Sequence, residues 1–277
     1  MNIQIQGRQL HYIEQGKGQP VIFIHGGIND YRSWQFQIGP FSKKYRVISY
    51  SRRFAYPNRQ LGNVVKDNTI GDNADDLAEL IRKLELAPVH LVGHSYGAFT
   101  ALYCAYRNPE LVKTLVLGEP PVLPFLAKSH LEDDLELLSW FRDDAQRPAM
   151  EAFEREDDEK AIRAFVDEVM GKKNAFDQIP ERARMLIMDN AKTLQGELES
   201  GMPTSFTIED AKQVSIPTLL VVGELSPRFF HRIIEILSDN MPNTEQATIP
   251  GVTHDLGRAT KPDILNAKVM EFLGKHA

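Results

Sequence analysis

The sequence predicts an α/β protein with a mostly parallel, doubly wound sheet. Short, continuous apolar runs recur along the chain, as in strands that are buried on both faces. Helical patterns lie between these runs, which is the order expected of strand–helix–strand units. After an N-terminal hairpin over residues 2–14, the expected strands cover residues 21–24, 47–49, 90–92, 114–117 and 218–222.

Two helices between these strands are predicted from their apolar pattern. Over residues 75–86, leucine and isoleucine recur at the spacing that places them on one helix face. Residues 97–106 are almost all apolar or small, so this second helix is expected to be buried. Both helices directly follow or precede an expected strand, which supports the alternating order.

Residues 122–205 break the alternation. This segment has no strand-like run, and it holds 19 acidic and 11 basic residues, a net charge of −8. The rest of the chain holds 19 acidic and 21 basic residues, a net charge of +2. We therefore expect a helical cap over 122–205, inserted into a core formed by residues 1–121 and 206–277.

The composition narrows the class of protein. The 277 residues carry a formal charge of −6, which argues against nucleic acid or an anionic membrane as the partner. Cys104 is the one cysteine, so no disulfide can form within the chain. The first residues do not resemble a signal peptide, and no run of 18 apolar residues exists. These features predict a cytoplasmic protein that acts on a small molecule, and they leave its oligomeric state open.

The segment Gly93-His94-Ser95-Tyr96-Gly97 carries the strongest chemical motif. It follows an expected strand and opens an expected helix, which is the context of a nucleophile turn. In such a turn the serine oxygen is exposed above the sheet, and the amides at the start of the helix point toward negative charge. The sequence therefore predicts Ser95 as a nucleophile.

A serine nucleophile needs a base, because its hydroxyl is weakly nucleophilic at neutral pH. A further short strand is expected to end at Pro250-Gly251, and His254 follows it in a loop. The other histidines lack this context, and His25 is expected to have a structural role. His254 is the predicted base.

These residues together resemble the α/β-hydrolase fold superfamily, in its serine-nucleophile branch with a helical cap. The resemblance rests on the strand order, His25-Gly26-Gly27, the Ser95 motif and His254, and it covers nearly the whole chain. It implies an oxyanion hole formed by the backbone amides of Tyr96 and Gly27, the latter from the loop after the strand at 21–24. Ile28 and Trp34 lie just downstream and are candidates for substrate contact.

The acid that orients His254 is open between two glutamates. Many relatives carry an aspartate in a Gly-x-x-Asp turn after the seventh strand, but here Ser226 occupies that position. Glu224 lies two residues earlier in the same turn, and Glu119 lies at the end of the sixth strand, where some branches of the superfamily take their acid. Both positions are at carboxyl ends of central strands. We favour Glu119.

Arg52 and Arg53 follow the fourth expected strand, near the predicted site. One of them, with Arg53 as the named candidate, could bind a substrate carboxylate, or it could anchor the loop through an ion pair. The predicted activity is hydrolysis of a small ester, lactone or thioester. Alternatives are hydrolytic C–C cleavage of a dienoic diketo acid by the same residues, and a ligand-binding relative without catalysis. No cofactor or metal is expected, since no histidine and cysteine cluster has zinc spacing.

Overall fold

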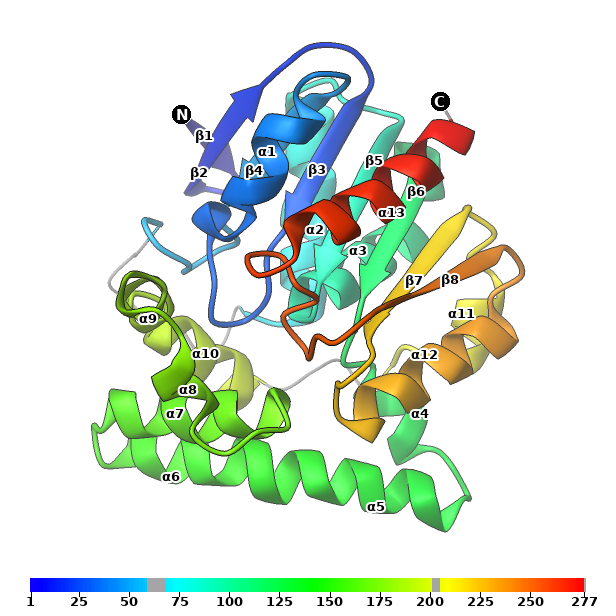
Figure 1. Ribbon diagram of the computed structural model, residues 1–277. Coiled ribbons are helices and arrows are strands. Elements are labelled where there is room, and N and C mark those ends of the chain that lie inside the picture. Colours follow the sequence, from blue (N-terminus) through cyan, green and yellow to red (C-terminus); the bar gives the residue numbers. More distant parts are fainter. Residues whose placement is uncertain (59–67, 201–204, 277) are drawn as a thin grey trace.

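The computed structural model of the chain describes residues 1–58, 68–200 and 205–276. Its sheet has eight strands among these residues, in the order β1-β2-β4-β3-β5-β6-β7-β8 (Figure 1). β1 and β2 pair antiparallel, as do β2 and β4, and every other pairing is parallel. The expected fold class is confirmed. The strands are β1 Asn2–Ile5, β2 Arg8–Gln15, β3 Pro20–Ile24, β4 Arg46–Tyr50, β5 Val89–His94, β6 Val112–Gly118, β7 Thr218–Gly223 and β8 Thr244–Ile249.

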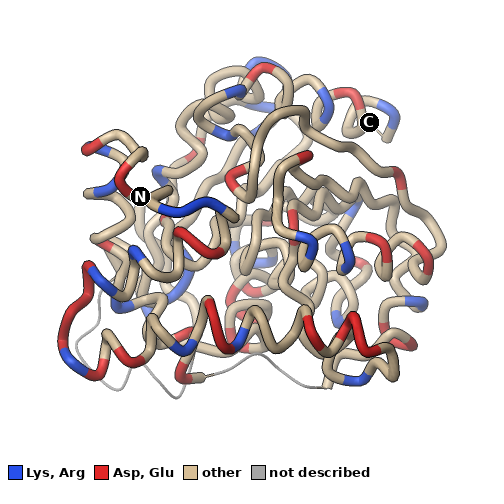
Figure 2. The backbone as a smooth tube through the Cα atoms, turned by 60° about the horizontal axis from the view of Figure 1, so that its bottom comes forward, with Lys and Arg blue, Asp and Glu red and all other residues tan. Residues whose placement is uncertain are grey.

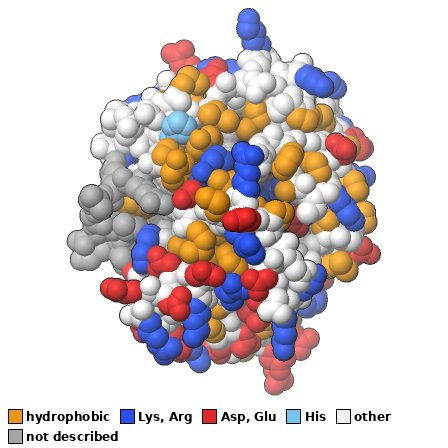
Figure 3. Space-filling model, turned by 60° about the vertical axis from the view of Figure 1, so that its left-hand side comes forward, with side chains coloured by type: hydrophobic (Ala, Val, Ile, Leu, Met, Phe, Trp, Pro, Cys, Tyr) orange, Lys and Arg blue, Asp and Glu red, His pale blue; other side chains and the backbone are white. Residues whose placement is uncertain are grey.

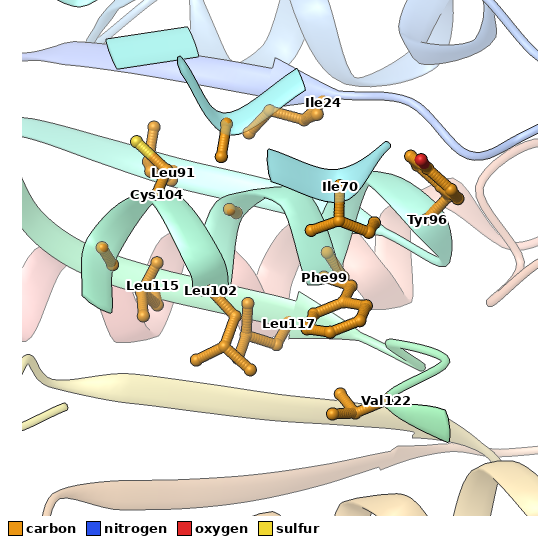
Figure 4. Close-up of a cluster of buried hydrophobic side chains, with 14 of the residues drawn as sticks. Ile24, Ile70, Leu91, Tyr96, Phe99, Leu102, Cys104, Leu115, Leu117 and Val122 are labelled. Atoms are coloured by element: carbon orange, nitrogen blue, oxygen red, sulfur yellow. The ribbon is translucent and has the colours of Figure 1, made fainter. Parts of the chain in front are cut away.

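Helices cover both faces of this sheet (Figure 1). α1 and α13 contribute apolar side chains to one buried cluster, and α2, α3 and α12 contribute to the larger cluster on the other face. Figure 4 shows part of the larger cluster, where Phe99 and Leu102 of α3 lie beside Leu115 and Leu117 of β6. These helices are α1 Gln35–Phe41, α2 Ile70–Lys83, α3 Tyr96–Arg107, α12 Arg228–Asn240 and α13 Pro262–Lys275.

α2 begins five residues before its expected start. Thr69 and Asp72 form a capping box, in which each side chain accepts a hydrogen bond from the backbone N–H of the other residue. The helix therefore begins at Ile70, directly after its cap. The apolar periodicity used for the prediction starts later than this polar first turn, which explains the difference.

Only helices occur among the described residues between β6 and β7 (Figure 1). The side chains of Val122 and Phe125, near the start of this segment, pack in the main core, and a separate apolar cluster lies between Ala149 and Leu194. The expected boundaries of the cap stay a prediction, and residues 201–204 lie outside the described residues. The helices are α4 Leu123–Ala127, α5 Glu132–Trp140, the π-helix η3 Phe141–Gln146, α6 Arg147–Glu154, α7 Asp158–Val169, α8 Ala175–Gln178, α9 Glu181–Met188, α10 Ala191–Ser200 and α11 Ile208–Lys212.

Acidic and basic residues are intermixed on the parts of the molecule seen in Figures 2 and 3. Figure 2 shows acidic residues recurring along the helices of the inserted segment, with basic residues between them. On the face shown in Figure 3, acidic and basic side chains lie next to one another. None of the helices in the described part of the chain has the length and apolar character needed to cross a membrane.

Candidate active site

Ser95 lies in the sharp turn between β5 and α3. Its backbone has φ 53° and ψ −125°, a conformation that side-chain-bearing residues rarely adopt. The glycines on either side are required by close packing. A Cβ atom at Gly93 would lie 2.5 Å from Cα of Ala98, and one at Gly97 would lie 2.4 Å from the backbone oxygen of Ile24. The turn thus holds Ser95 at the N-terminus of α3, where helix amides lack intrahelical partners.

His254 lies in the loop after β8 and meets Ser95 across the site. Its Nε2 is 3.1 Å from Oγ of Ser95, within reach for proton transfer. Two further neighbours hold His254, one at its ring and one at its backbone. The ring of Phe230 stacks on it with centroids 4.0 Å apart, and Nε2 of His94 donates a 2.6 Å hydrogen bond to the backbone carbonyl of His254.

Glu119 is the carboxylate that contacts His254. Its Oε2 is 2.5 Å from Nδ1 of His254, and its side chain is fully buried. The other oxygen, Oε1, accepts hydrogen bonds from the backbone N–H of Gly223 at 2.7 Å and from the hydroxyl of Ser226 at 2.5 Å. Ser226, at the position where many relatives carry the acid, therefore donates to the acid supplied by the neighbouring strand.

Glu224 has a different environment. It is exposed, and its Oε2 accepts a 2.7 Å hydrogen bond from the backbone N–H of Gly251. Among the described residues it forms no hydrogen bond to His254. Its carboxylate ties the turn after β7 to the loop that leads to His254.

The loop after β3 lies directly against the nucleophile turn. A Cβ atom at Gly26 would be 3.3 Å from Cβ of Ser95. His25 holds this loop, because its Nδ1 donates to the carbonyl of Gly26 at 2.8 Å and its Nε2 accepts from the backbone N–H of Arg52 at 2.9 Å. Burial, and then the nearby charge of Arg52, hold the pKa of His25 well below its usual value, so the ring stays neutral. Gly27 follows in the same loop.

The three expected substrate contacts have different surroundings. Ile28 is half-buried and packs against the apolar cluster of the inserted helices. Trp34 is 2% exposed and lies in the core below the sheet, with its ring 4.9 Å from that of Phe23. The expectation for Trp34 is therefore corrected, because a large aromatic side chain packed on Phe23 is part of the core on the face of α1 and α13.

Arg53 also has a structural role. Its Nε and Nη2 donate to the two carboxylate oxygens of Asp76 at 2.6 and 2.7 Å, and Nη2 also donates to the carbonyl of Asp72. This buried, bidentate ion pair joins the turn after β4 to α2. The expectation that Arg53 binds substrate is corrected in favour of the anchoring role that the sequence had left open.

Arg52 and Glu197 form a second buried ion pair, and no sequence pattern singles out this glutamate. Nη2 of Arg52 donates to Oε1 of Glu197 at 2.6 Å, and the arginine side chain has no exposed surface. Glu197 comes from α10 of the inserted segment, where acidic residues are frequent, and only tertiary packing distinguishes it. Burial raises the pKa of Glu197, and the charge of Arg52 opposes this shift.

The described residues contain no group of three or more His, Cys, Asp or Glu side chains that could hold a metal ion. The structure brings Ser95, His254 and Glu119 together at the carboxyl ends of β5, β6 and β8. It leaves Glu224, Trp34 and Arg53 in structural contacts.

Comparison with known proteins identifies the family. The sequence model of the family described as alpha/beta hydrolase fold matches residues 19–256. The chain is 24% identical over 175 residues to YraK, an uncharacterised hydrolase of Bacillus subtilis, covering 63% of this chain and 64% of that protein. It is 36% identical over 110 residues to the (E)-2-((N-methylformamido)methylene)succinate hydrolase of Acinetobacter baylyi, covering 40% and 41%. Both alignments span less than two thirds of the relative's own length.

Solved structures agree with this match over the whole chain. A thermophilic esterase from Thermogutta terrifontis has a TM-score of 0.75 at 22% identity, with all of both chains covered. A meta-cleavage product hydrolase from Pseudomonas fluorescens has a TM-score of 0.72 at 21% identity, with 100% of this chain and 98% of that chain covered. At these identities the likeness concerns the fold. The family match over most of the sequence and the shared architecture show that this chain belongs to the alpha/beta hydrolase fold family.

Proposed function

We propose that the chain is a serine hydrolase that cleaves a small carboxylic ester, lactone or thioester through an acyl-enzyme. The observation that carries this proposal is the continuous contact from Oγ of Ser95 through His254 to Glu119, with distances of 3.1 and 2.5 Å. A nucleophile, a base and an orienting carboxylate in this series are the parts that acyl transfer needs. The relatives named as hydrolases support a hydrolytic reaction.

The proposed reaction has two halves. In the first, Nε2 of His254 takes the proton of Ser95 while Oγ attacks the acyl carbon, and the protonated imidazole then gives that proton to the leaving group. The backbone amides of Gly27 and Tyr96 are proposed to hold the oxyanion, and Glu119 stabilises the imidazolium. In the second half, water replaces Ser95 as the nucleophile by the same proton transfers, and this releases the acid product.

The arginine environment favours esters over the C–C cleavage of a diketo acid. That alternative uses the same three residues but needs a cation to bind the substrate carboxylate. Arg52 is already paired with Glu197, and Arg53 is already paired with Asp76. Engaging a substrate carboxylate would break a buried pair, which costs about 3–5 kcal/mol. A solely ligand-binding role does not require a base aligned on the nucleophile, so the geometry also favours an enzyme.

A fluorophosphonate probe and a panel of p-nitrophenyl esters and lactones test the proposal. We expect the probe to label Ser95 in the folded protein, and we expect Ser95→Ala to lose labelling and about 10⁴-fold or more of the ester turnover. Because the hydroxyl lies at a strained turn, circular dichroism of the variant is the control for folding. A folded wild-type protein that takes up no probe, or a Ser95→Ala variant that keeps its turnover, would contradict the proposed function.

A further inference from the structure

A carboxylate from the inserted segment lies beside the predicted oxyanion loop. Glu197 of α10 is 5% exposed, and a Cβ atom at Gly27 would lie only 2.5 Å from its Oε2. Cδ1 of Leu194, one helical turn earlier, would lie 3.8 Å from this Cβ atom. α10 thus places one acidic and one apolar side chain directly over Gly27, whose amide is the proposed oxyanion donor.

Arg52 contacts this carboxylate, and its N–H groups donate hydrogen bonds to neighbouring acceptors. Its Nε donates to the carbonyl of His25 at 3.1 Å, and its Nη2 donates both to the carbonyl of Gly26 at 3.1 Å and to Oε1 of Glu197. The guanidinium also lies over the ring of Tyr96, 4.5 Å from its centroid. The positive charge is therefore directed at the loop backbone and at one oxygen of Glu197.

The second oxygen of Glu197 is left for another group. Among the described residues, Oε2 has no hydrogen-bond partner, although the side chain is almost fully buried. Oε2 keeps access to solvent, and a group that takes the place of this solvent compensates the carboxylate only if it donates a hydrogen bond. A second carboxylate at the same place would add like-charge repulsion in a site of low dielectric constant.

We propose that Glu197 is a specificity-determining residue that excludes acyl groups carrying a carboxylate and restricts the enzyme to uncharged or hydrogen-bond-donating acyl groups. This inference rests on the proposed function, because it places the acyl group of an ester next to Gly27. The Arg52–Glu197 pair gives the site a fixed polarity, with the negative end toward Gly27 and the positive end behind it. Removing the negative end leaves Arg52 without a carboxylate partner, although it keeps its hydrogen bonds to the carbonyls of His25 and Gly26, and makes the local charge positive.

A solely structural ion pair makes a different prediction. The pair also connects α10 to the loop after β3, so its loss lowers stability whatever the substrate. Such a loss changes the turnover of all esters by a similar factor. The informative quantity is therefore the ratio of kcat/KM for two esters of equal chain length, p-nitrophenyl pentanoate and p-nitrophenyl hemiglutarate, which differ in a terminal carboxylate.

We expect the wild-type protein to prefer the pentanoate by about tenfold or more, and Glu197→Gln to reduce this preference by about tenfold or more. Glu199→Gln is the matched control, since it removes the same charge from an exposed position on the same helix, and its ratio should equal that of the wild type. Equal kcat/KM for both esters in the wild type overturns the inference even if Glu197→Gln does not fold. An unchanged ratio in folded Glu197→Gln overturns it as well.

The two proposals fail in distinguishable ways. If the protein hydrolyses neither ester and takes up no fluorophosphonate, the result contradicts both the proposed function and this inference. A protein that is labelled at Ser95 but turns over neither ester is tested by protection, with pentanamide and glutaramate, which differ in a terminal carboxylate, competing against the probe. Stronger protection by pentanamide supports the inference, and equal or stronger protection by glutaramate overturns it while leaving the proposed function in place.

Discussion

The turns after β6 and β7 contain the same dipeptide and use it in opposite ways. Gly118-Glu119 ends β6, and Gly223-Glu224 ends the adjacent parallel strand β7. Glu119 has no exposed surface and contacts His254, whereas Glu224 is exposed and accepts a hydrogen bond from the backbone N–H of Gly251. Residue type and strand position are alike, so neither decides which carboxylate reaches the histidine.

The backbone path makes the difference. Glu119 has φ 48°, in the left-handed region, and its side chain lies between His254 and Ser226. The serine that occupies the usual acid position on β7 is small enough to leave room for this carboxylate and also donates to it. The two turns together therefore form one site, in which β6 supplies the charge and β7 supplies hydrogen-bond donors from Gly223 and Ser226.

The largest effect is expected from a substitution in the turn after β6. Glu119→Gln should lower kcat by about 10³–10⁴-fold with little change in KM, because an amide does not stabilise the imidazolium and can favour the wrong tautomer of His254. Steady-state kinetics with a p-nitrophenyl ester measure this. A folded variant with more than half of the wild-type kcat would remove Glu119 from the mechanism.

A second prediction concerns the space between the two turns. A Cβ atom at Gly223 would lie 2.6 Å from the backbone oxygen of Thr253 and 2.7 Å from Oγ of Ser226. Gly223→Ala should therefore displace the loop that carries His254, cost about 1–3 kcal/mol in the free energy of unfolding and reduce kcat. Urea unfolding and kinetics check both effects. Gly39→Ala is the control, because nothing lies within 4 Å of a Cβ atom there, and its stability should not fall.

A smaller effect tests the contribution of β7 to the acid. Ser226→Ala removes the 2.5 Å hydrogen bond to Oε1 of Glu119 but leaves the bond from the backbone N–H of Gly223. A hydrogen bond to a charged group contributes about 1.5–3 kcal/mol, so kcat should fall by about tenfold. An unaltered kcat would limit Ser226 to filling space.

The smallest effect is expected at Glu224. Glu224→Gln keeps an oxygen that can accept the hydrogen bond from Gly251, and the side chain is exposed. We therefore expect kcat to stay within about twofold of the wild type, as for most surface substitutions. The same assay measures it, and a fall comparable to that of Glu119→Gln would show that the two turns share the acid.

The fold and the nucleophile turn could be predicted because local patterns specify them. Buried parallel strands have continuous apolar sequences, and the Gly93–Gly97 motif encodes the close approach that a Cβ atom would block. The position of His254 after the last strand followed from chain order. The sequence narrows the acid to two residues, Glu119 and Glu224, and only the backbone geometry decides between them.

The remaining contacts depend on distant parts of the chain. Arg52 and Arg53 are neighbours in sequence, but one pairs with Glu197 of α10 and the other with Asp76 of α2. No local pattern indicates which arginine points which way. The closeness of Trp34 to Gly27 in the sequence predicts a place at the site, but its side chain packs in the core on the face of α1 and α13. Side-chain direction in a loop region and packing of an inserted segment are tertiary properties that periodicity does not encode.

The central claim is that the turn after β6, not the turn after β7, supplies the acid to His254. Its most direct test is the single-turnover rate of acylation of Ser95, measured for Glu119→Gln and Glu224→Gln in parallel with one p-nitrophenyl ester. We predict that acylation in Glu224→Gln exceeds that in Glu119→Gln by about 10³-fold or more. Equal rates, or slower acylation in Glu224→Gln, would contradict the claim.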